Sequence, residues 1–266
     1  MTRIIVITSG KGGVGKTTTT ANLGMSLAQL GYQTVLVDAD VGLRNLDLLL
    51  GLENRIIYTA FEVLSGECTI EQALIKDKRQ PTLKLLPTAQ NRNKDSMSSA
   101  QMKYLISLLE EHYDYILIDC PAGIETGFHN AICSAHEAIV ITTPEITAVR
   151  DADRVIGLLE ANNINKIHLL INRLRPKMVK SNNMMSVSDV KEILAIPLLG
   201  IIPEDEFVII STNRGEPLVL EKKLSLPGIA FENIAYRLTG QKVEFMDFES
   251  QSKNPLKRLR QFFLGS

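Results

Sequence analysis

Short apolar runs alternate along the chain with longer segments in which apolar residues recur every three or four positions. Continuous apolar runs are typical of strands buried on both faces of a parallel sheet, and the periodic segments are typical of amphipathic helices. Strands are expected at residues 4–7, 33–38, 83–86, 115–119, 138–142, 167–172 and 198–202. Helices are expected at residues 16–30, 61–64, 98–112, 148–161, 186–194 and 227–238. This order predicts an α/β fold in three layers, with a mostly parallel sheet and helices on both faces.

The alternation continues without a repeat or a change in composition until about Glu249. We therefore expect one domain over residues 1–248, followed by a tether and a C-terminal amphipathic helix over residues 249–266. The first strand begins within three residues, so no signal or transit peptide is expected. Apolar runs stay short of the ~20 residues that a membrane-spanning helix needs.

A glycine-rich stretch lies between the first strand and the first helix, Gly10-Lys11-Gly12-Gly13-Val14-Gly15-Lys16-Thr17. Its spacing is the phosphate-binding P-loop pattern, in which glycines let several backbone N–H groups approach one anion at a helix N-terminus. We expect Lys16 to contact the β- and γ-phosphates, the Thr17 hydroxyl to ligate Mg²⁺, and Thr18 to complete the loop. A glycine-rich turn without a ligand is the alternative. The stretch predicts a P-loop NTPase.

Polar side chains end three of the predicted strands: Asp38, Asp119 and Asn172. Ligands of open α/β sheets bind at the carboxyl ends of the strands. Asp119 follows four apolar residues, and we expect it to hold Mg²⁺ through a water beside the P-loop. We predict that Asp40 orients or deprotonates the attacking water and that Asp38 is a metal-side or structural partner, although spacing alone does not divide these roles. A capping role is the alternative for each carboxylate.

A base pocket is expected at the end of the strand over residues 167–172. The Asn172 amide can pair with the donor and acceptor edge of a purine, and the Arg173 guanidinium can stack on its ring. Asn172 as a loop cap is the alternative. The stretch that begins at Pro203 is expected to form the other wall of this pocket.

The net charge and the cysteines restrict the ligands and the compartment that can be expected for this chain. The net charge of the 266 residues is −1, so any contact with nucleic acid or membrane must be local. The three cysteines, Cys68, Cys120 and Cys133, are scattered and lack CxxC spacing. They indicate a reducing compartment, with neither a disulfide framework nor a zinc site.

The C-terminal segment has a local pattern of its own. At 100° per residue, one side of a helix collects Leu256, Leu259, Phe262 and Phe263, and the other side carries Lys257 and Arg258. A bulky apolar face with a basic polar face is typical of a helix that lies in the interface of an anionic membrane. A helix docked on the core is the alternative.

The run from Lys11 to Thr17 resembles the deviant P-loop of the ParA/MinD family of dimerising ATPases. Further stretches resemble members of that family that regulate the division site of bacteria and plastids: Asp38–Asp47, Asp119–Glu125, Pro144-Glu145 with Val149–Asp151, and Gly200–Asp205. The resemblance implies a weak ATPase that uses ATP and Mg²⁺, dimerises on ATP and binds membrane as a dimer. It implies a MinC-like division inhibitor and a MinE-like activator as partners, and no specific nucleic acid.

The same resemblance implies roles for particular residues. Lys11 would reach across the dimer and act in catalysis with Lys16 and Asp40, and Glu145 would lie near the ribose. Partner-binding surface is expected around Arg44, Asn45, Asp151 and Asp153. The protein would be located in the cytoplasm or chloroplast stroma, peripheral on the inner face of the membrane.

Three other functions remain open on the same fold. A ParA-like partition ATPase would need a basic face for DNA, whereas the cluster Arg173-Arg175-Lys177-Lys180 is expected to be a solvated loop. An iron–sulfur reductase would need cluster thiolates at a dimer axis, for which Cys120 and Cys133 lack suitable surroundings. A small-molecule ligase or kinase would need a substrate pocket that no residues announce.

Overall fold

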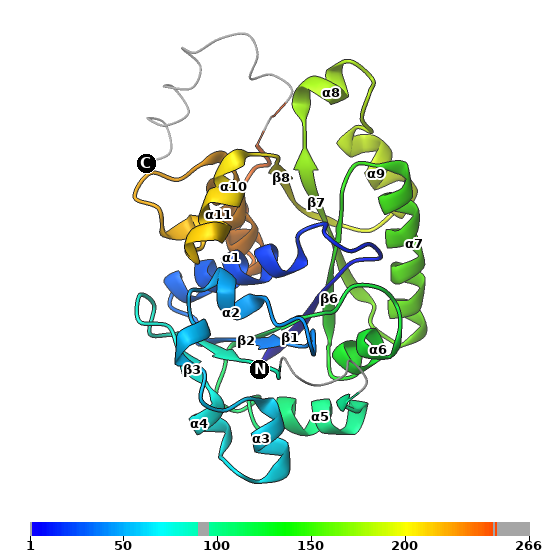
Figure 1. Ribbon diagram of the computed structural model, residues 1–266. Helices are drawn as coiled ribbons and strands as arrows, with labels where there is room; N and C mark the ends of the chain where they lie inside the picture. Colours follow the sequence, from blue (N-terminus) through cyan, green and yellow to red (C-terminus); the bar gives the residue numbers. More distant parts are fainter. Residues whose placement is uncertain (1, 90–95, 247, 249–266) are drawn as a thin grey trace.

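A single eight-stranded sheet runs through the centre of the computed structural model, which describes residues 2–89, 96–246 and 248 (Figure 1). The strand order is β3-β4-β2-β5-β1-β6-β7-β8. The strands are β1 (Arg3–Thr8), β2 (Thr34–Asp38), β3 (Ile75–Lys76), β4 (Leu83–Leu86), β5 (Tyr115–Asp119), β6 (Glu137–Thr142), β7 (Lys166–Leu174) and β8 (Leu198–Pro203). Among the described strands, every pairing is parallel except that of β3 with β4. The predicted α/β fold is confirmed.

Helices cover both faces of the sheet, as Figure 1 shows. They are α1 (Lys16–Gln29), α2 (Leu46–Leu49), α3 (Ala60–Ser65), α4 (Ile70–Ala73), α5 (Ser99–Ser107), α6 (Thr126–Ile132), α7 (Ile146–Ala161), α8 (Pro176–Lys180), α9 (Val187–Leu194), α10 (Glu206–Arg214) and α11 (Leu226–Leu238). One core joins the sheet to α1, α2 and α11, and a second joins it to α3–α7 and α9. Along β1, Ile4 and Val6 face the second core, whereas Ile5 and Ile7 face the first. The period of two along a strand thus builds both cores.

Local capping decides where several helices begin. Thr59, Ser98 and Ser186 each occupy the N-cap position of a capping box, with Glu62, Gln101 and Asp189 as the respective partners. In each box the side chains satisfy backbone N–H groups that the first turn leaves without partners.

The parallel order brings the carboxyl ends of the strands to one edge. β1 lies between β5 and β6, so the P-loop that follows β1 leaves the middle of this edge. Asp38 of β2 is the register partner of Asp119 of β5, and Asp119 is also the partner of Ile7. Two carboxylates that are far apart in sequence therefore become neighbours beside the P-loop.

Some elements differ from those predicted. The sequence pattern did not indicate β3, α2, α4, α6, α8 or α10, and the helix expected over residues 98–112 ends as α5 at Ser107. The prediction that the basic cluster from Arg173 to Lys180 is a solvated loop is wrong in part, because Pro176 at N1 begins the short helix α8. β7 also extends past Asn172 through an irregularity at which Arg173 takes a positive φ of 56°.

The predictions for the C-terminal segment lie outside the described residues. This applies to the boundary at 249, and to Leu256, Lys257, Arg258, Leu259, Phe262 and Phe263. Within the described part of the chain, no helix has the length and apolar character required to cross a membrane.

Candidate nucleotide-binding site

The P-loop is a tight turn held between two other elements. Gly13 and Gly15 have φ values of 75° and 103°, which L side chains rarely adopt. A Cβ at Gly15 would overlap the Asn172 amide, and a Cβ at Gly10 would overlap the backbone carbonyl of Asp151 on α7. Glycine is therefore required at positions 10 and 15 by packing against β7 and α7, as well as by the approach of a phosphate.

The two lysines of the loop lie in different environments. Lys16 is 7% exposed, and its Nζ donates to Ser9 Oγ at 3.1 Å. Lys11 is exposed at the rim, where its Nζ lies 3.6 Å from Glu145 Oε2 of the same chain. Ser9 Oγ in turn donates to the Lys11 carbonyl at 2.8 Å. Sequence reasoning missed Ser9, although its place directly after β1 at the carboxyl edge was an available signal.

Asp38 and Asp119 form a buried carboxylate pair beside Lys16 and Thr17. Thr20 Oγ1 donates to Asp119 Oδ1 at 3.0 Å. Burial raises the pKa of Asp119 to about 6, although the hydrogen bond from Thr17 and the charge of Lys16 oppose this rise. Burial and then the charge of Asp119 raise the pKa of Asp38 well above its ordinary value. A cation would relieve the cost of ionising this pair.

These residues fit Mg²⁺. Across the described ranges, no group of three or more His, Cys, Asp or Glu side chains could hold a metal ion. Mg²⁺ does not need such a group, because it keeps several waters and binds one or two carboxylates together with substrate phosphates. Thr17 hydrogen-bonds to Asp119, and Asp119 adjoins Asp38, so the three predicted metal-site residues meet at one point.

Asp40 lies close to the same pair. Its backbone N–H donates to Asp38 Oδ1 at 3.0 Å, and the Leu46 N–H approaches Asp38 Oδ2 at 3.4 Å. The charge of Asp40 adds to the rise in the pKa values of both Asp38 and Asp119. The structure therefore brings Asp40 to the metal side of the P-loop, and its role toward water stays a prediction.

Asn172 links the expected base pocket to the P-loop. Its Nδ2 donates to the Val14 carbonyl at 2.7 Å, and its Oδ1 accepts from the Arg173 N–H at 2.9 Å. The first bond fixes the orientation of the amide. An amide oxygen has two lone pairs, so Oδ1 keeps capacity for one further donor.

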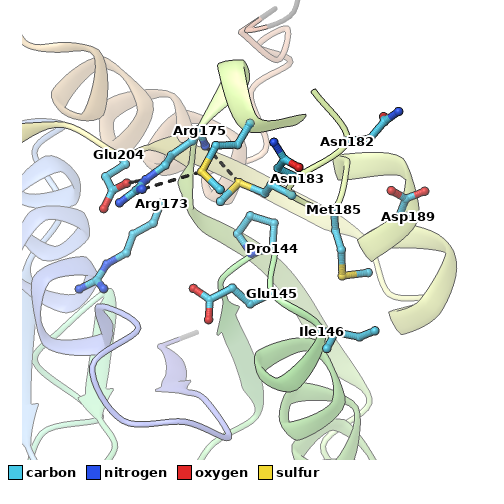
Figure 2. Close-up of a pocket in the computed structure, with 12 residues that line it drawn as sticks. Pro144, Glu145, Ile146, Arg173, Arg175, Asn182, Asn183, Met185, Asp189 and Glu204 are labelled. Atoms are coloured by element: carbon cyan, nitrogen blue, oxygen red, sulfur yellow. Dashed lines mark hydrogen bonds and ion pairs between the residues drawn. The ribbon is translucent and has the colours of Figure 1, made fainter. Parts of the chain in front are cut away.

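A cleft of about 740 Å³ opens between the start of α7, the ends of β7 and β8, and the segment from α8 to α9 (Figure 2), and its lining includes Arg173 but not Asn172 or Pro203. Pro144, Glu145 and Ile146 line one side, and Arg173 and Arg175 line the other. Methionine, asparagine and acidic side chains complete the lining: Met178, Asn182, Asn183, Met184, Met185, Asp189 and Glu204. Arg175 forms an ion pair with Glu204, and the predicted wall residue Pro203 is buried at the end of β8.

The predicted partner-binding residues do not share one environment. Arg44 Nε lies 2.8 Å from Asp47 Oδ2, and the Asp47 side chain is fully buried, so Arg44 is largely used within the chain. Asn45 and Asp153 are exposed. Asp151 packs through its backbone against Gly10. Partner binding at these residues stays a prediction.

Cys120 directly follows Asp119 and is buried. Burial raises the pKa of the Cys120 thiol to about 12. A cluster held at a dimer axis needs cysteine sulfur at the surface, so the burial of Cys120 disfavours the iron–sulfur alternative.

A P-loop, a buried carboxylate pair and a parallel sheet that gathers them at one edge define a P-loop nucleotide-binding protein. The family described as the CobQ/CobB/MinD/ParA nucleotide binding domain matches residues 5–218. The chain belongs to this family, and the resemblance to ParA/MinD proteins is confirmed.

Septum site-determining proteins are among the relatives at high identity. The putative septum site-determining protein MinD of Guillardia theta is 77% identical over 266 residues, covering 100% of this chain and 99% of that protein. A chain of the MinC:MinD cell division protein complex of Aquifex aeolicus is 46% identical, with a TM-score of 0.86 over 92% of this chain and 98% of that chain. MinD of Pyrococcus horikoshii, solved with Mg-ADP, is 34% identical, with a TM-score of 0.81 over 90% of this chain and 96% of that chain.

Proposed function

We propose that this chain is a Mg²⁺-dependent ATPase that dimerises on ATP and binds membrane reversibly to place the division site of a bacterium or plastid. The observation that carries this proposal is the meeting of the P-loop, the Asp38–Asp119 pair and Asp40 at one edge of the sheet. The septum-site names of relatives at up to 77% identity support the biological role.

Each residue of the edge has a defined task in this proposal. The backbone N–H groups of the P-loop and Lys16 would bind the phosphates, and Thr17 with the carboxylate pair would hold Mg²⁺, whose positive charge would offset that of the phosphates. Asp40 orients the attacking water. Because no protein nucleophile takes part, catalysis rests on positioning and electrostatics, and we expect turnover well below the ~1–100 s⁻¹ typical of kinases.

Asn172 can pair with adenine. Its Nδ2 has two N–H groups and donates one to Val14, and its Oδ1 has two lone pairs and uses one for the Arg173 N–H, so one donor and one acceptor remain. Adenine offers an amino donor at position 6 beside the acceptor N7, whereas guanine offers two acceptors at the same edge. A side chain with one donor and one acceptor therefore supports ATP over GTP.

Reversible membrane binding is expected because the proposed amphipathic helix is short. Residues 255–264 are fewer than the ~12 residues that a stable helix in water needs, so this stretch should become helical only on lipid. Four buried large side chains offer at most ~6–12 kcal/mol, and ordering the segment offsets much of this. Two segments on one dimer raise the effective concentration and can strengthen binding by ~10²–10⁴. ATP-driven dimerisation would thus control membrane occupancy.

The partners and location belong to the same proposal. An inhibitor of division would bind the ATP-bound dimer on the membrane, and an activator would stimulate hydrolysis and release it. Support for the inhibitor comes from the Aquifex aeolicus structure, which is a MinC:MinD complex. The protein would work in the cytoplasm or chloroplast stroma, at the inner face of the membrane.

Vesicle co-sedimentation tests the proposal. The full chain and its Phe263→Glu variant are mixed with anionic vesicles in ATP or in ADP, and the Asp40→Ala variant is used to preserve ATP. We expect strong binding only with ATP and an intact C-terminal segment. Equal sedimentation under all these conditions would overturn the membrane function. A monomer in ATP, seen by light scattering of the Asp40→Ala variant, would overturn the dimer.

A further inference from the structure

Ser9 joins the two lysines of the P-loop through one buried hydroxyl. We propose that Ser9 is a positioning residue that holds the backbone of Lys11 in the conformation required for dimerisation. This inference rests on the proposed function, because it concerns the role of Lys11 at a second subunit.

The hydroxyl of Ser9 acts both as a donor and as an acceptor. Its single proton is donated to the Lys11 carbonyl at 2.8 Å, and its oxygen accepts from Lys16 Nζ at 3.1 Å. Ser9 has no exposed surface. A charged donor polarises the hydroxyl, and in a buried site this strengthens the bond that the hydroxyl itself donates. The Lys11 carbonyl is thus held by a hydroxyl that the Lys16 ammonium polarises.

Binding of phosphate leaves this arrangement possible. A lysine ammonium has three N–H donors, so Lys16 can keep one on Ser9 while the others face the phosphates. Ser9 therefore connects the lysine that binds phosphate to the lysine at the rim. The hydrogen bonds from Lys16 to Ser9 and from Ser9 to Lys11 all lie within residues 9–16, so this connection requires no movement of the rest of the chain.

The side chain of Lys11 has no comparable restraint. Its ammonium lies 3.6 Å from Glu145, and the two side chains are 47% and 55% exposed. Exposed pairs of this kind contribute little, so the side chain can leave Glu145 and point toward another subunit. What the fold specifies is the position of the Lys11 backbone, from which the side chain extends. Ser9 supplies that restraint, together with the packing of Gly10 against Asp151.

Removing the hydroxyl should separate nucleotide binding from dimerisation. In Ser9→Ala, the glycines of the loop still present their N–H groups and Lys16 keeps its charge, so ATP binding should weaken by less than about threefold. The Lys11 carbonyl loses its donor, and ordering the loop at the interface becomes more costly. A single hydrogen bond of ordinary strength corresponds to a loss of about fivefold to tenfold in the dimerisation constant.

The experiment measures both quantities in the full chain. Dimerisation is followed by light scattering in ATP and Mg²⁺, with Asp40→Ala as the background to prevent hydrolysis. ATP affinity of the monomer is measured by calorimetry in a Lys11→Ala background. Thr19→Val is the matched control, because the buried Thr19 hydroxyl, also near the loop, has no hydrogen-bond partner within the described part of the chain. Ser9→Thr keeps the hydroxyl and should restore dimerisation.

The outcomes are distinct. A fivefold to tenfold loss of dimerisation in Ser9→Ala, with ATP affinity nearly unchanged and Thr19→Val at the reference level, supports the inference. An equal loss of ATP affinity and dimerisation, or no loss in either, overturns it. If the Asp40→Ala reference itself stays monomeric in ATP, the proposed function fails instead.

Discussion

The buried pair of Asp38 and Asp119 predicts an unusual gain in stability when one carboxylate is neutralised. The substitution is Asp119→Asn, which keeps the shape of the side chain and an oxygen that accepts from Thr20. The pKa of Asp119 rises from its ordinary 3.8 to about 6 in the folded protein because of burial. At ~1.4 kcal/mol per pKa unit, holding this carboxylate ionised costs about 3 kcal/mol at pH 7.5.

The sign of the pH dependence follows from proton binding. Between pH ~4 and ~6 the folded protein binds more protons at Asp119 than the unfolded chain does. The contribution of Asp119 to the free energy of unfolding therefore falls as the pH rises through this window, and it is constant above it. We expect Asp119→Asn to raise the free energy of unfolding by about 1–3 kcal/mol at pH 7.5. The gain is at most the full cost of ionisation because the amide loses the attraction of Lys16 that the carboxylate had. The gain should shrink as the pH falls through this window and disappear below pH ~4.

Urea denaturation from pH 4.5 to 8, without nucleotide or Mg²⁺, measures this effect. Asp153→Asn is the control, because Asp153 is exposed on α7 and should give no such pH dependence. A second measurement adds Mg-ADP, which should stabilise the unsubstituted protein but not Asp119→Asn, because the variant lacks the metal-side carboxylate. Loss of stability in Asp119→Asn at pH 7.5, or a gain that is the same at every pH, would refute the reasoning.

Three further predictions concern the base pocket, a distant ion pair and the chemistry. Asn172→Ala should bring the affinities for ATP and GTP closer together, as measured by calorimetry, whereas an unchanged ratio would contradict base reading by Asn172. Arg79→Met should lower the free energy of unfolding in urea by about 3–5 kcal/mol, because it leaves Asp77, 1% exposed, as a buried charge without the 2.5 Å ion pair; a neutral effect would contradict this. Lys16→Ala should abolish ATP binding in calorimetry, whereas Asp40→Ala should keep ATP binding and lose phosphate release; normal release would show that Asp40 does not act on the water.

Local patterns in the sequence determined much of the fold. The apolar runs of β1, β2 and β5 are long and β-rich enough to be read without knowledge of their neighbours, and the P-loop spacing located the phosphate site between a strand and a helix. Helices with weaker periodicity were missed. α10, for example, leaves Phe207 and Ile209 exposed and buries Ser211, so its pattern does not indicate which face meets the core.

Other features were decided only by contacts between distant parts of the chain. The orientation of the Asn172 amide depends on Val14, 158 residues away, and the packing of Gly51 depends on Gly215. The raised pKa of Asp119 depends on the register that places β5 beside β2 and on the helices that bury both strands.

These two groups of features differ in the sequence distance over which their physical causes act. Propensity, periodicity and turn chemistry act over a few residues, so the class of fold, the P-loop and the candidate acids could be predicted from local patterns alone. Burial, register and hydrogen bonds across the sheet depend on the order of the strands, which crossover connections specify. Contacts across the fold therefore set which carboxylates lie next to each other, which amide is bonded to the P-loop, and which hydroxyl joins the two lysines.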